Sequence, residues 1–370
     1  MTMPAHTRAP FHPLGDADIR TVDIDAPLKQ RMNQLIANDD DLADLKQLAQ
    51  AGAKLLKPFD PLQLPSNLAY HFLFAPHGKY MDECEWVAAR TGHKPHIIAA
   101  LQRLYSLSKL SPGAPEGEAG CTAAPYYYHP SAGMYLARCL DWTAPGEALA
   151  AATRIVHYTR GGDLKYKAVQ ALGMTGHLSI LKPGKFAIAI NWAPEHGLVG
   201  VQTEPTHRLR EIAEDDSIQT FEQAIEALTD PDHDIAADTF FTVVGVESKQ
   251  MCVIERQGSS DRYHRRNAPA GMSYLVQANH YDPQGRFKRH PANWVSETLP
   301  AGEDGYDLPT SQTTKARQLA MEAALASINP AADPVTELHR CLENVPVRNS
   351  FTRQQMVFHV QSGHIHAWRQ

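Results

Sequence analysis

The sequence predicts an α+β sandwich preceded by a helical segment, because its first third and its remainder carry different patterns. Apolar side chains recur at helical spacing over residues 26–56, 81–90 and 94–110. From residue 121 onward, short apolar runs bounded by turn residues predict strands, and two helices at 209–213 and 220–228 interrupt them. Helices that precede and separate groups of strands fit an α+β arrangement.

The strand-rich part can be followed element by element. Residues 178–192 predict a hairpin that turns at Pro183-Gly184. Further strands are expected at 239–245, 251–255 and 273–278, then a polar loop at 282–313, a helix at 314–328 and a closing strand pair at 356–368. Residues 1–20, rich in Pro and His, predict a loose tail.

A loop separates the two parts. Residues 111–120 are rich in Pro and Gly, acidic and poor in large apolar side chains. Such a surface loop can be cut without loss of the core. We therefore expect a helical small subunit over residues 1–120 and a catalytic subunit over residues 121–370.

Bulk composition narrows the class of protein. The chain has 370 residues, 43% of them hydrophobic, and a net charge of −6 with its basic residues scattered, which does not favour nucleic acid as a partner. Its apolar runs are too short for a membrane span. Five cysteines without CxxC spacing argue against a disulfide framework. The N-terminus has no pattern of a signal peptide, so the expected location is the cytoplasm.

Cys121 carries the most informative chemistry. It opens a strand-like run, and the next strand holds Arg138 and Asp141. If the chain is cut at Gly120-Cys121, the thiol, with a pKa of about 8.5, and the new α-amine, at about 7.7–8.0, lie on one residue. The amine can then act as the base for the thiol. Strand alternation places Arg138 and Asp141 on opposite faces, so we expect a bulge near Cys139-Leu140 that turns both toward the thiol.

The motifs around this hairpin resemble a known family. Gly120-Cys-Thr followed by Ala137-Arg-Cys-Leu-Asp-Trp142 resembles the cleavage site and Arg-Asn-Leu-Asp pattern of acid ceramidase and N-acylethanolamine-hydrolysing acid amidase. Val276-Gln-Ala-Asn279 with Tyr281-Asp282, and Asn344-Val-Pro-Val-Arg-Asn-Ser-Phe-Thr352, are similar to later segments of the same family. These enzymes belong to the N-terminal nucleophile superfamily, with bile-salt hydrolases and penicillin V acylase.

The resemblance implies a fold and a set of roles. The fold would be an αββα sandwich behind a helical prodomain. Cys121 would be the nucleophile, Arg138 and Asp141 its partners, Asn279 an oxyanion-hole donor and Arg317 the later active-site arginine. The chain departs from the family pattern at Cys139, at the inserted His280 and in a longer stretch between Asn279 and Arg317.

Other candidate residues lie outside this set. Tyr126 beside the nucleophile and Met174 in a glycine turn could line an apolar acyl pocket, although packing alone would also account for both. His364-Ile-His366 and Asp232-His-Asp234 lack a third ligand at a recognisable spacing, so no metal is expected. No cofactor is expected either.

The leading hypothesis is a self-processing cysteine amidase acting on a small-molecule N-acyl amide with a lipid-like acyl group through a Cys121 thioester. The two cleavage products would remain associated. One alternative is an acyltransferase of the isopenicillin-N type that uses the same nucleophile. Another is a non-catalytic scaffold in which Cys121 is only a buried thiol.

Overall fold

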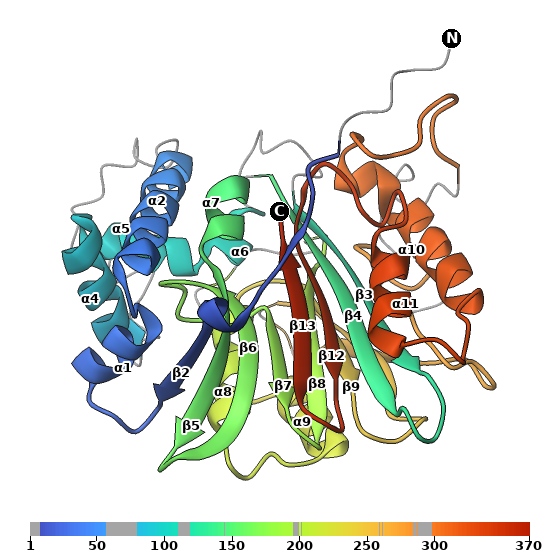
Figure 1. Ribbon diagram of the computed structural model, residues 1–370, viewed down its shortest axis with the longest axis horizontal. Helices are drawn as coiled ribbons and strands as arrows, with labels where there is room; N and C mark the ends of the chain where they lie inside the picture. The colour runs from blue at the N-terminus through green and yellow to red at the C-terminus, as the bar shows by residue number, and fades with distance from the viewer. Residues whose placement is uncertain are drawn as a thin grey trace.

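Two facing β-sheets form the centre of the protein, as the computed structural model in Figure 1 shows. The structure describes residues 8–56, 80–109, 119–143, 145–194, 200, 202–258, 260, 262–283, 287 and 298–370. Within these ranges one sheet has five strands in the order β1 (His12–Pro13), β13 (His364–Arg369), β12 (Thr352–His359), β4 (Met134–Trp142) and β3 (Ala119–Tyr127).

The second sheet has eight strands in its described part. Their order is β11 (Tyr263–Asn267), β10 (Met251–Arg256), β9 (Thr239–Val244), β8 (Phe186–Trp192), β7 (Ser179–Lys182), β6 (Asp163–Ala171), β5 (Thr153–Arg160) and β2 (Ile19–Asp23). All neighbours pair antiparallel except β2, which runs parallel to β5 at the edge.

Helices cover the outer faces of both sheets. α10 (Thr310–Ala326) and α11 (Pro334–Leu342) pack on the five-stranded sheet, and α8 (Pro205–Glu214) and α9 (Phe221–Thr229) pack on the eight-stranded sheet. The layers are therefore helix, sheet, sheet and helix, which confirms the predicted α+β sandwich.

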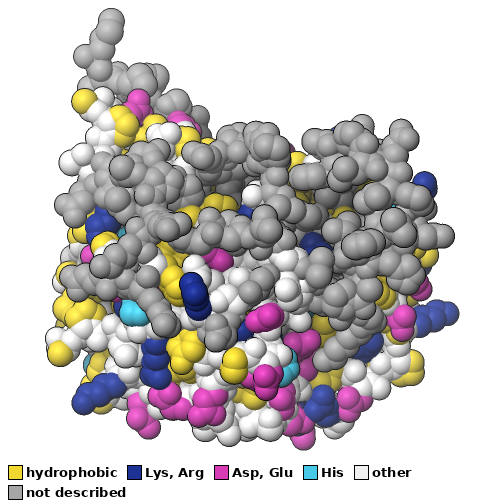
Figure 2. Space-filling model, turned by 180° about the vertical axis from the view of Figure 1, so that it is seen from behind, with side chains coloured by type: hydrophobic (Ala, Val, Ile, Leu, Met, Phe, Trp, Pro, Cys, Tyr) yellow, Lys and Arg dark blue, Asp and Glu magenta, His cyan; other side chains and the backbone are white. Residues whose placement is uncertain are grey.

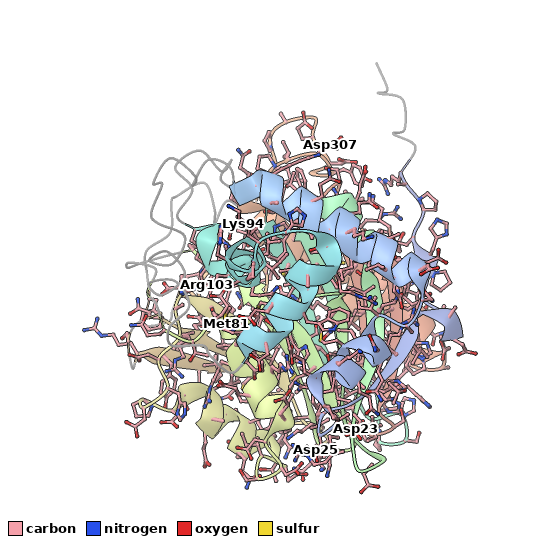
Figure 3. The ribbon with its side chains drawn as sticks, turned by 90° about the vertical axis from the view of Figure 1, so that its left-hand side faces the viewer. Asp23, Asp25, Met81, Lys94, Arg103 and Asp307 are labelled. Atoms are coloured by element: carbon pink, nitrogen blue, oxygen red, sulfur yellow. The ribbon has the colours of Figure 1, made fainter. Side chains whose placement is uncertain are left out.

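The N-terminal helices lie across one side of this sandwich, as Figure 3 shows. They are α1 (Leu28–Leu35), α2 (Asp39–Leu56), α4 (Met81–Thr91), α5 (Pro95–Gln102) and α6 (Leu104–Leu107). Two further short helices in the described residues are η1 (Asp16–Asp18), before β2, and α7 (Gly146–Ala151), between β4 and β5.

Alternation along the strands builds two cores. In β8, Ala187 and Ala189 face the inside of the sandwich, whereas Ile188 and Ile190 face the helices on the outer side. Both faces of the central strands β8 and β9 are buried, so these two strands are apolar almost throughout, which is the pattern of strands covered on both sides.

Several sequence predictions are confirmed and others are wrong. The hairpin at 178–192 and the closing strand pair are present. The loose tail is wrong from residue 12 onward, because β1 and β2 each join a sheet. Residues 273–278 form only isolated bridges to β3, at Tyr274 and Gln277. Residues 111–118 and most of 282–297 lie outside the described residues.

Figure 2 shows the molecule from behind the view of Figure 1, with acidic side chains gathered in the lower part of that face and basic ones scattered among them. α8 and α9 border an open groove there of about 660 Å³, with the carboxylates of Glu211, Asp215, Glu226 and Asp230 along it. No helix in the described ranges combines the length and the apolar character that a bilayer crossing requires.

A buried ion cluster joins the N-terminal part to the eight-stranded sheet. Asp41 of α2 is fully buried and accepts hydrogen bonds from Arg20 at 2.8 and 2.6 Å and from Arg154 Nε at 2.9 Å. Burial by itself would raise the pKa of Asp41, but hydrogen bonds from Arg20, the Ala37 amide and Arg154 outweigh it, so its pKa is lowered. Its charge is therefore part of the folded state.

Asp41→Asn is expected to lower the free energy of unfolding by about 3–5 kcal/mol, because the buried Arg20 loses its counter-charge and Arg154 loses one of the carboxylates that it pairs with. The lowered pKa of Asp41 means that its contribution is present above an ordinary carboxyl pKa of about 4 and is lost as the pH falls through the folded value. Denaturant unfolding from pH 7 to pH 3 should show this acid-sensitive part in the parent and not in the variant. Asp163→Asn at an exposed position is the control.

Candidate active site

The β3–β4 hairpin places Cys121 at the centre of the site. Cys121 pairs with Leu140 and Ala123 pairs with Arg138 in an uninterrupted antiparallel register. Ala123 belongs to the core between the sheets and Ala124 to the core under α10 and α11. Because side chains alternate along a strand, the Cys121 thiol faces the inside of the sandwich, on the same face as Arg138.

Arg138 holds its guanidinium beside the thiol. Its Nη2 lies 3.5 Å from Cys121 Sγ and donates to Ile190 O at 2.5 Å. Its Nη1 donates to Leu178 O at 2.8 Å and to the Ser179 hydroxyl. The side chain is fully buried, so backbone carbonyls of β8 and of the segment before β7 orient it. A fixed positive charge at the sulfur is the setting in which a cysteine acts as a nucleophile.

Asn279 and Arg317 meet the backbone of the same cysteine. Asn279 Oδ1 accepts from Cys121 N at 3.0 Å and from Arg317 Nη2 at 2.6 Å. Arg317 Nη1 donates to Cys121 O at 2.8 Å and to Thr122 Oγ1 at 3.0 Å. One guanidinium from α10 therefore fixes the carbonyl of the cysteine and, through Asn279, its nitrogen.

Asp141 lies on the other face of β4 and does not face the thiol. It accepts from Thr352 Oγ1 at 2.8 Å and pairs with Arg317 Nη1 at 3.4 Å. The expected bulge in β4 is wrong, because the register shift lies in β12, between Thr352 and Gln354. The carboxylate of Asp141 is therefore linked to the Cys121 carbonyl through Arg317.

The charge of Arg317 is balanced by the neighbouring carboxylate of Asp141. Burial lowers the pKa of Arg317, and the nearby carboxylate of Asp141 opposes that shift. An arginine with a lowered pKa still carries its charge at neutral pH, because its ordinary pKa is above 12. The pair of Arg317 and Asp141 is thus a fully buried ion pair with hydrogen bonds to both partners.

The remaining cysteines lie in different surroundings. Burial raises the pKa of Cys84 and of Cys252 to about 12 and that of Cys341 to about 11, and it raises the pKa of Cys139 well above its ordinary value. A thiol with a raised pKa holds little thiolate near neutrality. These four are poor candidates for a nucleophile.

The structure separates the two predicted substrate-binding residues. Tyr126 lies on the outer face of β3, in the cluster under α10 and α11, with its ring centroid 5.8 Å from that of Tyr128. It is therefore on the face of β3 opposite the Cys121 thiol. Met174 lines an apolar cavity of about 40 Å³ beside α2 and α5.

Several residues at the site were not found from the sequence. The Trp192 carbonyl accepts from Asn279 Nδ2 at 2.7 Å, and Thr314 Oγ1 accepts from the backbone N–H of Asn279 at 2.7 Å. Asn191 Nδ2 donates to Gln277 O at 2.8 Å and to Ala278 O at 3.1 Å. All of these contacts join segments distant in the chain, so no local spacing could reveal them.

Metal ligands do not gather in the described residues, where no group of three or more His, Cys, Asp or Glu side chains is arranged to hold an ion. Neither His364-Ile-His366 nor Asp232-His-Asp234 belongs to such a group within those residues.

Comparisons with known proteins find likenesses among solved structures. No family model matches the chain, and no curated protein matches it. Among solved structures, a Caenorhabditis elegans N-acylethanolamine-hydrolyzing acid amidase ortholog is similar at 16% identity and a TM-score of 0.47, over 68% of this chain and 100% of that chain. The function of this chain is inferred from the residues around Cys121.

Arg317→Lys is expected to lower the free energy of unfolding by about 3–5 kcal/mol, because a single ammonium cannot replace the hydrogen bonds of the buried guanidinium to Cys121 O, Asn279 Oδ1 and Thr310 O. The measurement is urea unfolding followed by circular dichroism. Arg340→Lys, in an exposed pair with Glu337, is the matched control and should change stability by less than about 0.5 kcal/mol. Equal effects at the two positions would contradict the structural role of Arg317.

Proposed function

We propose that this chain is a self-processing cysteine amidase of the N-terminal nucleophile type, similar to acid ceramidase and N-acylethanolamine-hydrolysing acid amidase. It would cut itself between Gly120 and Cys121 and then hydrolyse the amide bond of a small N-acylated molecule. The observation that carries the proposal is the environment of Cys121: Arg138 lies at its sulfur, and Asn279 lies at its nitrogen.

Self-cleavage would proceed through a thioester. Cys121 Sγ bonds to the carbonyl carbon of Gly120, the C–N bond between the two residues breaks, and the thiol proton passes to the nitrogen, which becomes the α-amine. Water then hydrolyses the thioester, which leaves a carboxyl group on Gly120 and restores the thiol. The amine so released stays within reach of the Asn279 oxygen that accepts from it in the uncut chain.

Amide hydrolysis would repeat these steps on a substrate. The α-amine accepts the thiol proton, the sulfur attacks the substrate carbonyl, and the leaving amine takes the proton. The acyl group then stays on Cys121 as a thioester until water releases it. In the uncut chain Asn279 Nδ2 donates one of its two hydrogens to Trp192 O, and its role as an oxyanion donor would use the other.

An apolar cavity supports the proposal that the substrate carries a lipid-like acyl group. Trp142 lines it, on the same face of β4 as Leu140, the cross-strand neighbour of Cys121. Met174 and side chains of the N-terminal helices, among them Leu45, Leu48, Val87, Ile98 and Leu101, form the rest of the lining. A cavity of about 40 Å³ admits only a short alkyl segment, so a long acyl chain would have to displace the helices that cover it.

Buried contacts across the proposed cut support lasting association of the two pieces. Glu83 pairs with Arg210 at 2.7 Å, and Ser106 Oγ donates to the buried Glu204 at 2.6 Å. Arg103, which Figure 3 places near Met81 on the N-terminal helices, donates to Gly200 O at 2.7 Å. Burial raises the pKa of Glu204, and the nearby Arg103 and Ser106 oppose that shift. The strand pairs β1–β13 and β2–β5 also cross the cut.

Cys121→Ser is expected to stop or greatly slow both self-cleavage and amide turnover, because a hydroxyl is a far weaker nucleophile near neutrality. Intact mass should show a single 370-residue chain for the variant, and pieces of residues 1–120 and 121–370 for the parent. Cys252→Ala is the control and should be cut like the parent. A parent chain that stays whole through long incubation at neutral and mildly acidic pH would rule the proposal out.

Asn279→Ala should lower turnover by roughly 10²–10³, the loss typical of a removed oxyanion donor, with substrate affinity little changed. Asp141→Asn should impair cleavage as well, because the Arg317 that positions Cys121 loses its counter-charge. Rates of both variants on one N-acyl amide, with and without an acceptor amine, test this and separate hydrolysis from acyl transfer. Parental activity in Asn279→Ala would place the oxyanion donor elsewhere.

A further inference from the structure

Gly120 lies directly against the first turn of α10. It pairs with Asp141 across the β3–β4 hairpin, on the face of β3 opposite the Cys121 thiol. A Cβ built on Gly120 would stand 2.7 Å from Thr310 Cβ, 2.9 Å from its Cγ2 and 3.0 Å from its Oγ1. The nearest of these atoms is bonded to the helix backbone, so no side-chain rotation can move it away.

Space, and not backbone conformation, requires glycine at this position. Gly120 is not among the glycines of positive φ, so another residue could adopt its backbone angles. An alanine methyl group would have to move about 0.7 Å away from Thr310 to reach an ordinary contact of 3.4 Å. That displacement would be transmitted to the carbonyl that the thiol has to attack.

α10 contacts both sides of the proposed scissile peptide. Arg317, seven residues after Thr310 on the same helix, donates to Cys121 O at 2.8 Å and to Thr310 O at 3.0 Å. The two contacts therefore belong to one rigid element: Thr310 meets the residue before the bond, and Arg317 holds the residue after it.

We propose that Thr310 is a specificity-determining residue for self-cleavage: its side chain leaves no room for a Cβ at position 120 and so makes glycine the residue required before the cut. The inference rests on the proposed function and deepens it. In the cleavage step the sulfur bonds to the Gly120 carbon as the C–N bond breaks and the thiol proton moves to the nitrogen, so the rate depends on where that carbon lies. Misplacement of reacting atoms by 1 Å can cost about 100-fold in rate.

The test is the rate of self-cleavage of the full chain, followed by intact mass. Gly120→Ala should slow cleavage by about 10- to 100-fold, in line with its forced displacement. The double variant Gly120→Ala with Thr310→Gly removes the atoms that the new methyl group meets, and it should recover most of the parental rate. Gly120→Ala with Gln312→Gly, a change at an exposed position of the same helical turn, should not recover it.

Each outcome has one meaning. Cleavage of Gly120→Ala at the parental rate would overturn the inference, as would equal recovery by Gln312→Gly. Gly15→Ala, a glycine with no atom within 4 Å of a built Cβ, should be cut like the parent. If Gly120→Ala does not fold, recovery of a folded and cut protein in the Thr310→Gly double variant alone supports the inference, and its absence overturns it. A parent that is never cut would instead overturn the proposed function.

Discussion

The buried guanidinium of Arg317 is the interaction on which the site depends. It binds the Cys121 carbonyl, the Asn279 amide oxygen, Thr310 O and the carboxylate of Asp141, and so joins β3, β4, α10 and the segment after β11. A buried charge of this kind is costly unless every donor finds a partner. The four segments are therefore held in one relative position, and the position of Cys121 follows from it.

The two faces of β3 make different contacts around Cys121. The inner face presents the thiol to Arg138, whose guanidinium is held by carbonyls of the eight-stranded sheet. The outer face presents Gly120 and Thr122 to α10. Sheet contacts thus set the surroundings of the sulfur, while helix contacts set the backbone on either side of it. Asp141 belongs to the second group, although its place in the motif suggested the first.

Buried hydrogen-bonded pairs accompany the apolar contacts between the N-terminal part and the sandwich. Asp41 with Arg154, Glu83 with Arg210, and Ser106 with Glu204 are buried hydrogen-bonded pairs that join residues before 120 to residues after it. Such pairs fix orientation because an unpaired member is penalised. They explain why the N-terminal helices are held over the apolar cavity near Trp142 rather than packed loosely against it.

The sequence by itself determined the layered α+β fold and the hairpin at 178–192, because periodicity and turn residues are local properties. Its motifs also named Arg138, Asn279 and Arg317, which contact Cys121 in the structure. Tertiary structure decided the rest. The bulge lies in β12 because Asp141 pairs with Thr352 across strands far apart in the chain. Tyr126 is turned away from the thiol by the pleat of an unbroken strand, and β1 and β2 are strands only because β13 and β5 offer them free edges. The requirement for glycine at position 120 comes from Thr310, 190 residues later, and such a contact has no local signature.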